Sequence, residues 1–343
     1  MSMNALVPLI ELTRGGYVEC THFGAIAVVN AGGTVLAQAG DADFVTFTRS
    51  TLKAFQALPF VEAGGVEHFG FSTPEVAMLC ASHNGEAKHV AAVDSMLSKS
   101  GSSYQRLRCG CGVPGLYSLM DKSAPEGLQF DERHHNCSGK HAGFVAHCLG
   151  QGWSVDDYTD PAHPLQQAVA KDVARAVGME VSAMRMGIDG CSAPNFAIPL
   201  SKLAYGYARL ASGTRDAEFG ASFALLGGAM SAHPDMVSGT GRNDAAFMEA
   251  GRGDWVTKIG ADGVQVIGSK SRGEALAIKI SDGNKTALYA AAVETLDQLG
   301  WLDDAQRAAL APWRASAILS ARGAAVGQRR PAFHLQAVWK MGR

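Results

Sequence analysis

The sequence predicts an α+β fold in which strands from both ends of the chain form an antiparallel sheet and helices pack against it. Strand-like patterns are concentrated in about residues 1–50 and 250–285, whereas about residues 51–249 are mainly helical in pattern. The regular alternation of strands and helices that a parallel doubly wound sheet requires is absent. Strands from the two ends are therefore expected to pair around a helical middle region, within a single domain over residues 1–343.

The first strands are expected to form a hairpin. Tyr17–Cys20 and Ala25–Val29 are rich in residues that favour strands, and Thr34–Gln38 follows after four residues. Those four, 30–33, are Asn-Ala-Gly-Gly and tolerate the positive φ of a tight turn. Three further strand-like runs follow in the last third of the chain, separated by short turns: Trp255–Ile259, Val264–Ile267 and Ala275–Ile280.

Patterns typical of helices fill the middle of the chain, and several of them begin at or near a proline, as helices commonly do. A loop rich in glycine, cysteine and proline is expected at Cys109–Gly115. The expected helices cover Ser50–Ala63, Pro74–Cys80, Glu86–Lys99, Gly139–Leu149, Pro164–Val177, Pro199–Ala211 and Asp216–Ser231, with a last one over about Thr286–Leu299.

The composition indicates a globular protein with a large core. Of its 343 residues, 47% are hydrophobic and 18% charged, and the net charge is −2 with Lys and Arg dispersed. That distribution is unlike a nucleic-acid-binding protein. No apolar run reaches membrane-spanning length and the N-terminus lacks the pattern of a signal peptide, so we expect a cytoplasmic protein. Seven cysteines, an odd number spread over a long chain, argue against a disulfide framework.

The first motif that carries chemistry is Ser50-x-x-Lys53. A serine and a lysine three residues apart on a helix project from the same face, so a neutral lysine amine can take the proton of the serine hydroxyl. The residues after Ser50 are largely apolar, which indicates that Lys53 lies in a buried helix. The motif therefore indicates a serine nucleophile with a lysine as its base. A solvated lysine after a helix start is the alternative interpretation of a lone copy.

Two further segments strengthen the catalytic interpretation. Ser82-x-Asn84 lies where a loop is expected, and Lys258-x-Gly260 ends a strand-like run. A glycine at the end of that run would let a substrate backbone approach closely. The order of the three motifs is that of β-lactamases and penicillin-binding proteins, although Ile259 stands where those enzymes prefer a hydroxyl. Taken alone, Ser82 would be interpreted as a helix cap or a turn residue.

Five segments together carry a resemblance that runs from about Glu11 to beyond Ile280. They are Phe47–Lys53, Ala81–Glu86, Asn136–His141, Gly187–Pro194 and Thr257–Gly263. In this order they resemble the L-asparaginase II family, the rhizobial-type or class 3 asparaginases. The resemblance implies a fold similar to the serine β-lactamases and Ser-dependent glutaminases. It also implies hydrolysis of L-asparagine to L-aspartate and ammonia, a homodimer, and a zinc ion near the active site.

The resemblance implies two Ser–Lys pairs, Ser50 with Lys53 and Ser82 with Lys258. A lysine near its reference pKa of about 10.4 is protonated at neutral pH and cannot act as a base, but burial and a second ammonium lower that pKa. We expect Ser50 to attack the side-chain amide, with Lys53 as its base and the Ser50 N–H as an oxyanion donor. Ser82 and Lys258 would relay the proton to ammonia and help activate water. The opposite assignment, in which Ser82 attacks, stays open.

The zinc ligands that the resemblance implies are Cys137, Lys140 and Cys191, completed by a water. Read without the resemblance, the two cysteines would be small buried residues, since zinc normally takes at least three protein ligands. The zinc is expected to order the pocket rather than act as the catalytic Lewis acid. His134, His135 and His141 are alternative ligands or neighbours of the ligands. The remaining cysteines are interpreted as a structural loop, Cys109 and Cys111, and as core residues, Cys20, Cys80 and Cys148.

The charged ends of the substrate must also be bound, and polar residues in the motif segments are the candidates: Arg49, His83, Asn84, Asp189 and Arg242. Arg242 could equally be a solvated surface arginine. Three alternative functions remain. The chain could be a glutaminase, another serine amidohydrolase such as a β-lactamase or a D-Ala peptidase, or a zinc-binding protein without catalytic activity.

Overall fold

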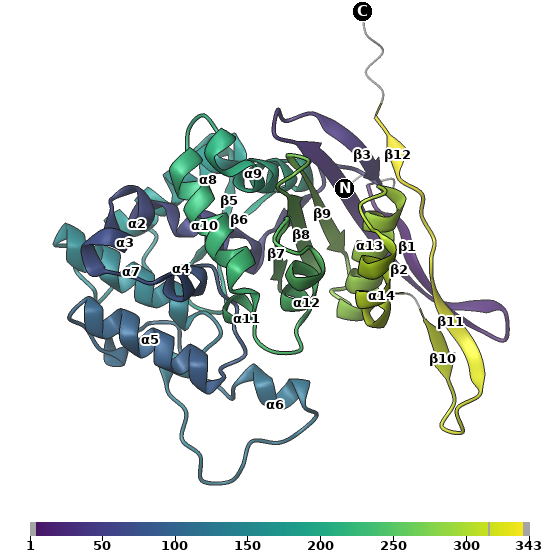
Figure 1. The fold of residues 1–343 in the computed structure, drawn as a ribbon, viewed down its shortest axis with the longest axis horizontal. Coiled ribbons are helices and arrows are strands. Elements are labelled where there is room, and N and C mark those ends of the chain that lie inside the picture. Colours follow the sequence, from purple (N-terminus) through teal and green to yellow (C-terminus); the bar gives the residue numbers. More distant parts are fainter. Residues whose placement is uncertain (1–4, 315, 339–343) are drawn as a thin grey trace, which may run out of the picture.

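A computed structural model describes residues 5–314 and 316–338 of the protein. Its main sheet is antiparallel and joins strands from both parts of the chain that predict them (Figure 1), in the order β10-β11-β1-β2-β9-β8-β7, with β3 beside β2 and β12 beside β3. The predicted α+β fold is thereby confirmed. The strands are β1 (Val7–Arg14), β2 (Tyr17–Asn30), β3 (Val35–Ala39), β7 (Trp255–Gly260), β8 (Val264–Ser269), β9 (Glu274–Ile280), β10 (Ala317–Leu319), β11 (Ala325–Pro331) and β12 (Gln336–Ala337).

Pairing between β2 and β9 joins the early and late parts of the chain. The register runs from Gly24 opposite Ile280 to Asn30 opposite Glu274. A Cβ at Gly24 would lie 2.1 Å from the carbonyl oxygen of Lys279, so the close approach of the two strands there requires glycine. The predicted hairpin is also present, since β2 and β3 pair antiparallel. Its turn is held by Asn30 Oδ1, which accepts hydrogen bonds from the backbone N–H groups of Gly32 and Thr34.

Helices cover both faces of the main sheet and form a separate helical region beside it (Figure 1). They are α1 (Lys53–Gln56), α2 (Leu58–Glu62), α3 (Gly65–Phe69), α4 (Thr73–Leu79), α5 (Ala87–Lys99), α6 (Gly115–Leu119), α7 (Ser138–Gln151), α8 (Pro164–Val177), α9 (Leu200–Ser212), α10 (Gly220–Ala232), α11 (Pro234–Val237), α12 (Asn243–Ala250), α13 (Lys285–Gln298) and α14 (Asp304–Ala309). Among the described residues, no helix combines the length and the apolar character needed to cross a membrane.

The sheet is buried on both faces because successive residues of its central strands enter two different cores. In β2, Ala25, Ala27 and Val29 pack in one apolar cluster, whereas Ile26 and Val28 pack in the other. Alternate side chains of a strand point to opposite faces, so the pleat itself produces this division. Helix α9 packs against the first face and α13 against the second.

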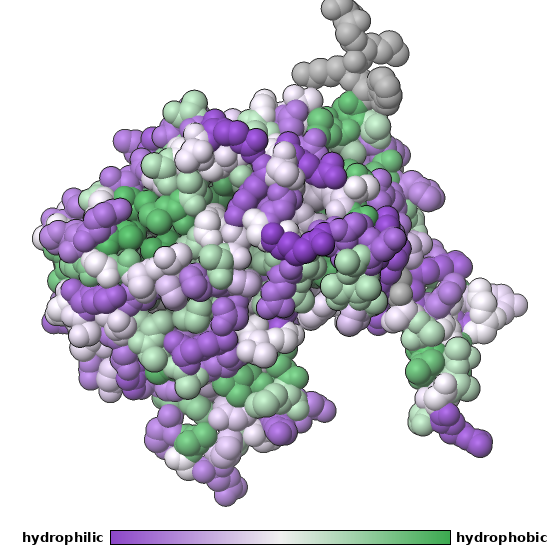
Figure 2. Space-filling view, viewed as in Figure 1, coloured by the Kyte–Doolittle hydropathy of each residue, from purple (hydrophilic) through white to green (hydrophobic). Residues whose placement is uncertain are grey.

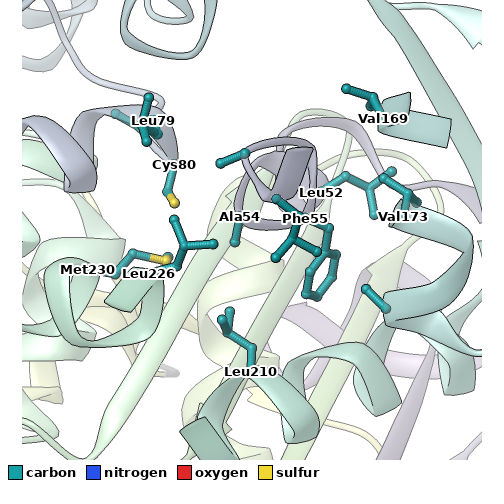
Figure 3. Close-up of a cluster of buried hydrophobic side chains, with 14 of the residues drawn as sticks. Leu52, Ala54, Phe55, Leu79, Cys80, Val169, Val173, Leu210, Leu226 and Met230 are labelled. Carbon is teal, nitrogen blue, oxygen red and sulfur yellow. The ribbon is translucent and has the colours of Figure 1, made fainter. Parts of the chain in front are cut away.

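Lys53 begins a short helix that is embedded in the first core. Figure 3 shows the apolar side chains around the start of α1, which come from α1 and the turn before it and from α4, α8, α9 and α10: Leu52, Ala54, Phe55, Leu79, Cys80, Val169, Val173, Leu210, Leu226 and Met230. The prediction of a buried helix after Ser50 is confirmed by this packing. The side chain of Lys53 is 1% exposed, so its amine has been removed from water.

The predicted helix over Ser50–Ala63 is wrong in its continuity. A 3₁₀-helix, η1 (Arg49–Leu52), leads into α1, and α2 starts after Ala57. Pro59 stands in the first turn of α2, where its missing N–H costs no helical hydrogen bond. The segment therefore consists of a 3₁₀ turn and two short helices that meet at Ala57, where the sequence pattern indicated one continuous helix.

Other elements escaped the sequence patterns. A second antiparallel sheet has the order β4 (Val45–Phe47), β6 (Pro194–Pro199) and β5 (Arg185–Ile188), and α14 follows the helix predicted to be the last. The prediction that Cys20 belongs to the core is wrong, because it lies in the exposed outer part of β2. Cys80 and Cys148 are buried, as predicted.

The surface is mostly a mixture of polar and apolar residues (Figure 2), with apolar patches on two projections at the bottom of the view. One projection carries α6 and the other carries the hairpins of β1–β2 and β10–β11 (Figure 1). Large apolar side chains exposed on these two projections are Val113, Leu119, Met120 and Leu128 on the first, and Tyr17, Val18 and Leu319 on the second.

Candidate active site

Lys53 contacts the second motif directly. Its Nζ donates a hydrogen bond to Ser82 Oγ at 2.9 Å and further hydrogen bonds to the carbonyl oxygens of Ala81 and Asn136. Ser82 follows α4 in an extended loop, and its backbone N–H donates to the Val237 carbonyl oxygen at 2.8 Å. The packing of α1 against this loop therefore joins two motifs that lie 29 residues apart.

Ser50, the predicted partner of Lys53, lies in the turn before α1. It is half-buried in η1, after Arg49, whose φ of +53° is in the left-handed region. The side chain of Asn195 holds this turn through both polar groups of the Arg49 backbone, at 3.0 and 2.9 Å. The backbone N–H of Lys53 donates to the Ser50 carbonyl oxygen, but among the described residues the two side chains share no hydrogen bond, although their spacing still places them on one side of the 3₁₀ turn. The serine hydroxyl to which the Lys53 amine is hydrogen-bonded is that of Ser82.

Lys258 is the second buried lysine of the site, at the end of β7. Its Nζ lies 3.4 Å from Asp244 Oδ2 and donates to the Ile259 carbonyl oxygen at 2.9 Å. Burial lowers the pKa of Lys258 to about 8, and the positive charges of Lys53 and Arg242 act in the same direction, while Asp244 opposes them. The predicted effect of one lysine on the other is thus present at Lys258. The described side chains contain no hydrogen bond between Lys258 and Ser82.

Gly260 brings the third motif against the first. A Cβ at this position would lie 2.7 Å from the Thr48 carbonyl oxygen and 3.3 Å from Arg49 Cβ. The absence of a side chain therefore lets the end of β7 pack on the turn that carries Ser50. This corrects the expectation that the glycine leaves space for a substrate backbone, because the chain itself occupies that space.

Asp244 is a site residue that the sequence reasoning missed. It is fully buried in the first turn of α12, directly after the glycine-rich segment that contains Arg242. Its carboxylate accepts hydrogen bonds from the Ile259 N–H at 2.9 Å and from Thr257 Oγ1 at 3.1 Å. A carboxylate next to a glycine-rich turn was the available signal, but nothing in the spacing indicates that it meets Lys258.

Arg49 and Asp189, two of the predicted substrate-binding residues, form an ion pair. Arg49 Nη2 lies 2.8 Å from Asp189 Oδ1, and Arg49 Nη1 contacts Asp262 on the other side. Together they line a surface pocket of about 360 Å³ next to the Ser50 turn. The pocket is completed by Thr46, Phe47, Gly187, Ile188, Asn195 and Lys279.

Arg242 and Asn84 lie at the Ser82 loop. Arg242 is half-buried, and its Nη1 donates to the Ser82 carbonyl oxygen at 3.1 Å, so it is not a solvated surface arginine. Asn84 is buried against Gly239, where a Cβ would lie 2.2 Å from Asn84 Oδ1. That oxygen has no hydrogen-bond partner among the described residues. It is therefore a polar atom that the described chain leaves unsatisfied close to Ser82.

His83 is held inside the protein rather than in the pocket. Its Nε2 pairs with Ser138 Oγ at 2.9 Å, and its Nδ1 accepts from the Gly85 N–H at 3.2 Å. Burial lowers the pKa of His83 well below its usual value, so the ring is neutral. Because both ring nitrogens have protein partners, any effect of His83 on substrate would act through the position of Ser82 and Asn84.

The predicted metal ligands converge at the start of α7. Lys140 Nζ lies 3.1 Å from Cys191 Sγ, and Cys137 precedes the helix that carries Lys140. The neighbouring Cys137 thiol and the charge of Lys140 hold the pKa of Cys191 well below its usual value. The same pairing with Cys191, together with burial, raises the pKa of Cys137.

His141 adds a nitrogen to this cysteine cluster, which we define as Cys137, Lys140, His141 and Cys191. Its Nδ1 pairs with Tyr158 Oη at 2.8 Å, and its buried Nε2 has no partner among the described residues. Burial lowers the pKa of His141 to about 4, although Cys191 acts in the opposite direction. A ring that is neutral and has an unsatisfied nitrogen beside a thiolate suits a metal ion.

The donor set of the cysteine cluster fits zinc. Two sulfurs and a nitrogen are ligands that zinc prefers in proteins. Across residues 5–314 and 316–338, no three His, Cys, Asp or Glu side chains gather as a metal site, so His141 does not complete a three-ligand set with both cysteines, and Lys140 is the nitrogen donor beside Cys191. His134 pairs with Asp131 instead, at 3.2 Å. Burial lowers the pKa of His135.

A sequence model of the L-asparaginase II family matches residues 10–331, which is nearly the whole chain. The chain belongs to the L-asparaginase II family. It is therefore a hydrolase that acts on amides, and the family identifies its substrate as a small molecule. The resemblance of the five motif segments is thereby confirmed. No curated protein matches the sequence.

Two solved structures illustrate what this L-asparaginase II family chain is similar to. One is described as a "putative beta-lactamase from Bacteroides dorei DSM 17855", with 13% identity, a TM-score of 0.44, and coverage of 80% of this chain and 93% of that one. The other is a beta-lactamase from Mycobacterium bovis, with 15% identity, a TM-score of 0.36, and coverage of 84% of this chain and 94% of that one. Both TM-scores are below 0.5, so no function is transferred from these structures.

Proposed function

We propose that this L-asparaginase II family protein hydrolyses L-asparagine to L-aspartate and ammonia through an acyl-enzyme formed by Ser–Lys catalysis. The observation that carries the proposal is the hydrogen bond between Lys53 Nζ and Ser82 Oγ at 2.9 Å, beside a second buried lysine, Lys258. A serine hydroxyl paired with a buried amine is the arrangement that nucleophilic acyl transfer requires. Membership of the family supports the choice of an amide substrate.

Ser50 is the proposed nucleophile. It is half-buried, whereas Ser82 is only 4% exposed, so Ser50 is the more accessible of the two hydroxyls. Within the described residues, the Ser50 N–H donates no hydrogen bond to the protein, which leaves it available to an oxyanion. Lys53 would take the proton of Ser50. The direct hydrogen bond from Lys53 to Ser82 favours the second candidate, in which Ser82 attacks and Lys53 is its base.

The proton would reach the leaving ammonia through Ser82. In this scheme Ser50 Oγ forms a bond to the amide carbon while its proton passes to Lys53. Lys53 donates to Ser82 Oγ, and Ser82 protonates the departing nitrogen as the C–N bond breaks. Lys258, with a pKa of about 8, has a neutral fraction near neutral pH and would help to activate the water that releases L-aspartate.

The pocket of Arg49 and Asp189 would bind the two charged ends of the amino acid. A zwitterion needs a cation for its carboxylate and an anion for its ammonium, and these side chains lie next to the Ser50 turn. Arg242, Asn84 and His83 would position the reacting end. L-Glutamine adds one methylene, which changes binding by about 1–3 kcal/mol in an apolar pocket, so weaker glutaminase activity is compatible with the site.

Cys137, Lys140 and Cys191 would hold a zinc ion, with a water as the remaining ligand. When bound, the ion supplies positive charge and order next to the pocket. Lys140 binds a metal only when its amine is neutral, and the cysteines bind it as thiolates, so the affinity for zinc should fall as the pH is lowered. We also propose that two copies of this chain form a homodimer.

The test is ammonia release from L-asparagine, with L-glutamine and nitrocefin in parallel, on purified metal-replete protein. Turnover of L-asparagine in preference to the other two is expected. Rapid acid quench followed by peptide mass spectrometry should find the aspartyl group on Ser50, and finding it on Ser82 would favour the second candidate. Turnover of none of the three would reject catalysis and leave a zinc-binding protein.

A further inference from the structure

Asp244 is the buried carboxylate of the site, and its oxygens face donors on several sides. Oδ1 accepts hydrogen bonds from Thr257 Oγ1 at 3.1 Å and from Gln265 Nε2 at 3.0 Å. Oδ2 accepts from the Ile259 N–H at 2.9 Å and lies 3.4 Å from Lys258 Nζ. An ionised carboxylate accepts hydrogen bonds and donates none, so this environment suits the charged form.

Asp244 holds the end of β7 by two connected contacts. Its Oδ2 binds the N–H of Ile259, while Lys258 Nζ donates to the carbonyl oxygen of that same residue. The carboxylate, the lysine amine and the Ile259 peptide therefore form a closed set of contacts. With the carboxylate gone, the Ile259 carbonyl would be the sole hydrogen-bond acceptor of Lys258 that the structure describes.

Asp244 is the group near Lys258 that favours the protonated form of its amine, whereas Lys53 and Arg242 disfavour that form. The ionisable groups that face Lys258 are Asp244, Lys53, Arg242 and the thiol of Cys80, whose pKa burial raises to about 12. Tyr207 and Tyr289 also face Asp244, and burial raises the pKa of both phenols. Asp244 is therefore the only carboxylate among these groups of the described chain, and removing it leaves Lys258 facing Lys53 and Arg242 without an opposing acid.

We propose that Asp244 is the positioning residue of Lys258: it orients the amine and keeps its proton exchange in the pH range in which the enzyme works. This inference rests on the proposed function only in giving Lys258 a part in catalysis. Asp244 acts through Lys258 and reaches no substrate atom itself. The inference adds to the two Ser–Lys pairs a carboxylate from a different helix.

The first experiment measures the protonation of Lys258 without using activity. Protein labelled with [6-¹³C]lysine gives a Cε signal for Lys258, assigned by its loss in Lys258→Met, whose shift is followed against pH. The midpoint should lie near 8 in the natural protein. In Asp244→Asn it should fall by at least one pH unit. Asp172→Asn is the matched control, because it also removes a buried aspartate that pairs with a cation, at 2.7 Å from Arg175, and should leave the midpoint in place.

The second experiment separates positioning from a purely structural role. Asp244→Asn should lower kcat at least tenfold with KM within threefold, and should move the limb of the pH profile that depends on Lys258 to lower pH. Asp244→Glu restores the charge, so it should return that limb towards its natural position even if kcat stays low. An Asp244→Asn protein with an unchanged midpoint and an unchanged pH profile would overturn the inference.

Folding of the variants is checked by circular dichroism and thermal unfolding. If Asp244→Asn does not fold, the natural protein labelled with [4-¹³C]aspartate is used. One Cγ signal should shift with the midpoint of Lys258 and lose that response in Lys258→Met; the lack of such a signal would overturn the inference. A natural protein that releases no ammonia, but whose Lys258 midpoint moves in Asp244→Asn, would instead reject the proposed function and keep the effect of Asp244.

Discussion

Two buried lysines of this protein differ in one respect, the charge of their neighbours. We call Ser50, Lys53, Ser82 and Lys258 the Ser–Lys cluster. Lys258 in this cluster and Lys140 in the cysteine cluster are both almost completely removed from water. Burial and nearby cations lower the pKa of Lys258 to about 8. Burial also acts to lower the pKa of Lys140, but the sulfurs of Cys191 and Cys137 outweigh it and raise the pKa.

The comparison shows that depth alone does not assign a chemical role to a lysine. Desolvation disfavours the charged form in both places, and the neighbouring groups decide the outcome. Lys258 can exchange a proton near neutral pH, which suits acid–base chemistry. Lys140 without a metal is a cation that holds a thiolate, and it has to give up its proton before it can bind zinc. In the proposed function, the two clusters therefore use the same side chain for catalysis and for metal binding.

The largest effect is expected from removing the members of the Ser–Lys cluster itself. Ser50→Ala and Lys53→Met should each lower kcat by about 10³-fold or more, because the nucleophile or its base is lost. Steady-state ammonia release measures this. Ser98→Ala on the exposed side of α5 is the control and should keep full activity. Activity within threefold of the natural protein in either variant would refute the roles assigned to that residue.

The two buried lysines should separate in their kinetic parameters. Lys258→Met should lower kcat about 100-fold, as expected for an acid–base group, whereas Lys140→Met and zinc chelation should mainly raise KM. Cys191→Ser should resemble chelation, and Cys20→Ser, which changes an exposed cysteine, should not. A large fall in kcat with KM unchanged after chelation would contradict the binding role of the cysteine cluster.

The pH dependence should show the pKa of Lys258 directly. Because deacylation needs its neutral form, kcat should rise with pH through a midpoint near 8, and Lys258→Met should lose this limb. The lowered pKa also means that the unfolded chain binds more protons than the folded chain between about pH 8 and 10.5. The contribution of Lys258 to the free energy of unfolding therefore increases with pH across this window. Denaturant titrations of the natural protein and of Lys258→Met at several pH values can measure this increase.

The smallest effect is expected from a change at Gly260, where the end of β7 packs against the turn that carries Ser50. Gly260→Ala would place a Cβ 2.7 Å from the Thr48 carbonyl oxygen and should lower the free energy of unfolding by about 1–3 kcal/mol. It should also lower kcat, because the turn of Ser50 and the end of β7 must separate. Gly228→Ala within α10 is the matched control, since its Cβ would meet nothing within 4 Å. That change should raise stability by about 0.5–1 kcal/mol.

Local patterns predicted much of the fold. The hairpin before β3, the three strands from β7 to β9, and α8 over Pro164–Val177 follow from residue types and periodicity over short stretches. The second sheet was missed because its strands are short. The break between α1 and α2 was missed because an apolar run that includes Pro59 still has helical periodicity.

The sequence by itself determined the family, the α+β fold and the residue types of the site, because each depends on short segments and their order. Only the tertiary structure decided which groups meet: Lys53 with Ser82, and Lys258 with Asp244. These partners come from separate elements that are brought together by the packing of α1, α12 and β7. Spacing along a chain restricts contacts within one turn or strand, whereas contacts between elements depend on how their apolar faces are buried.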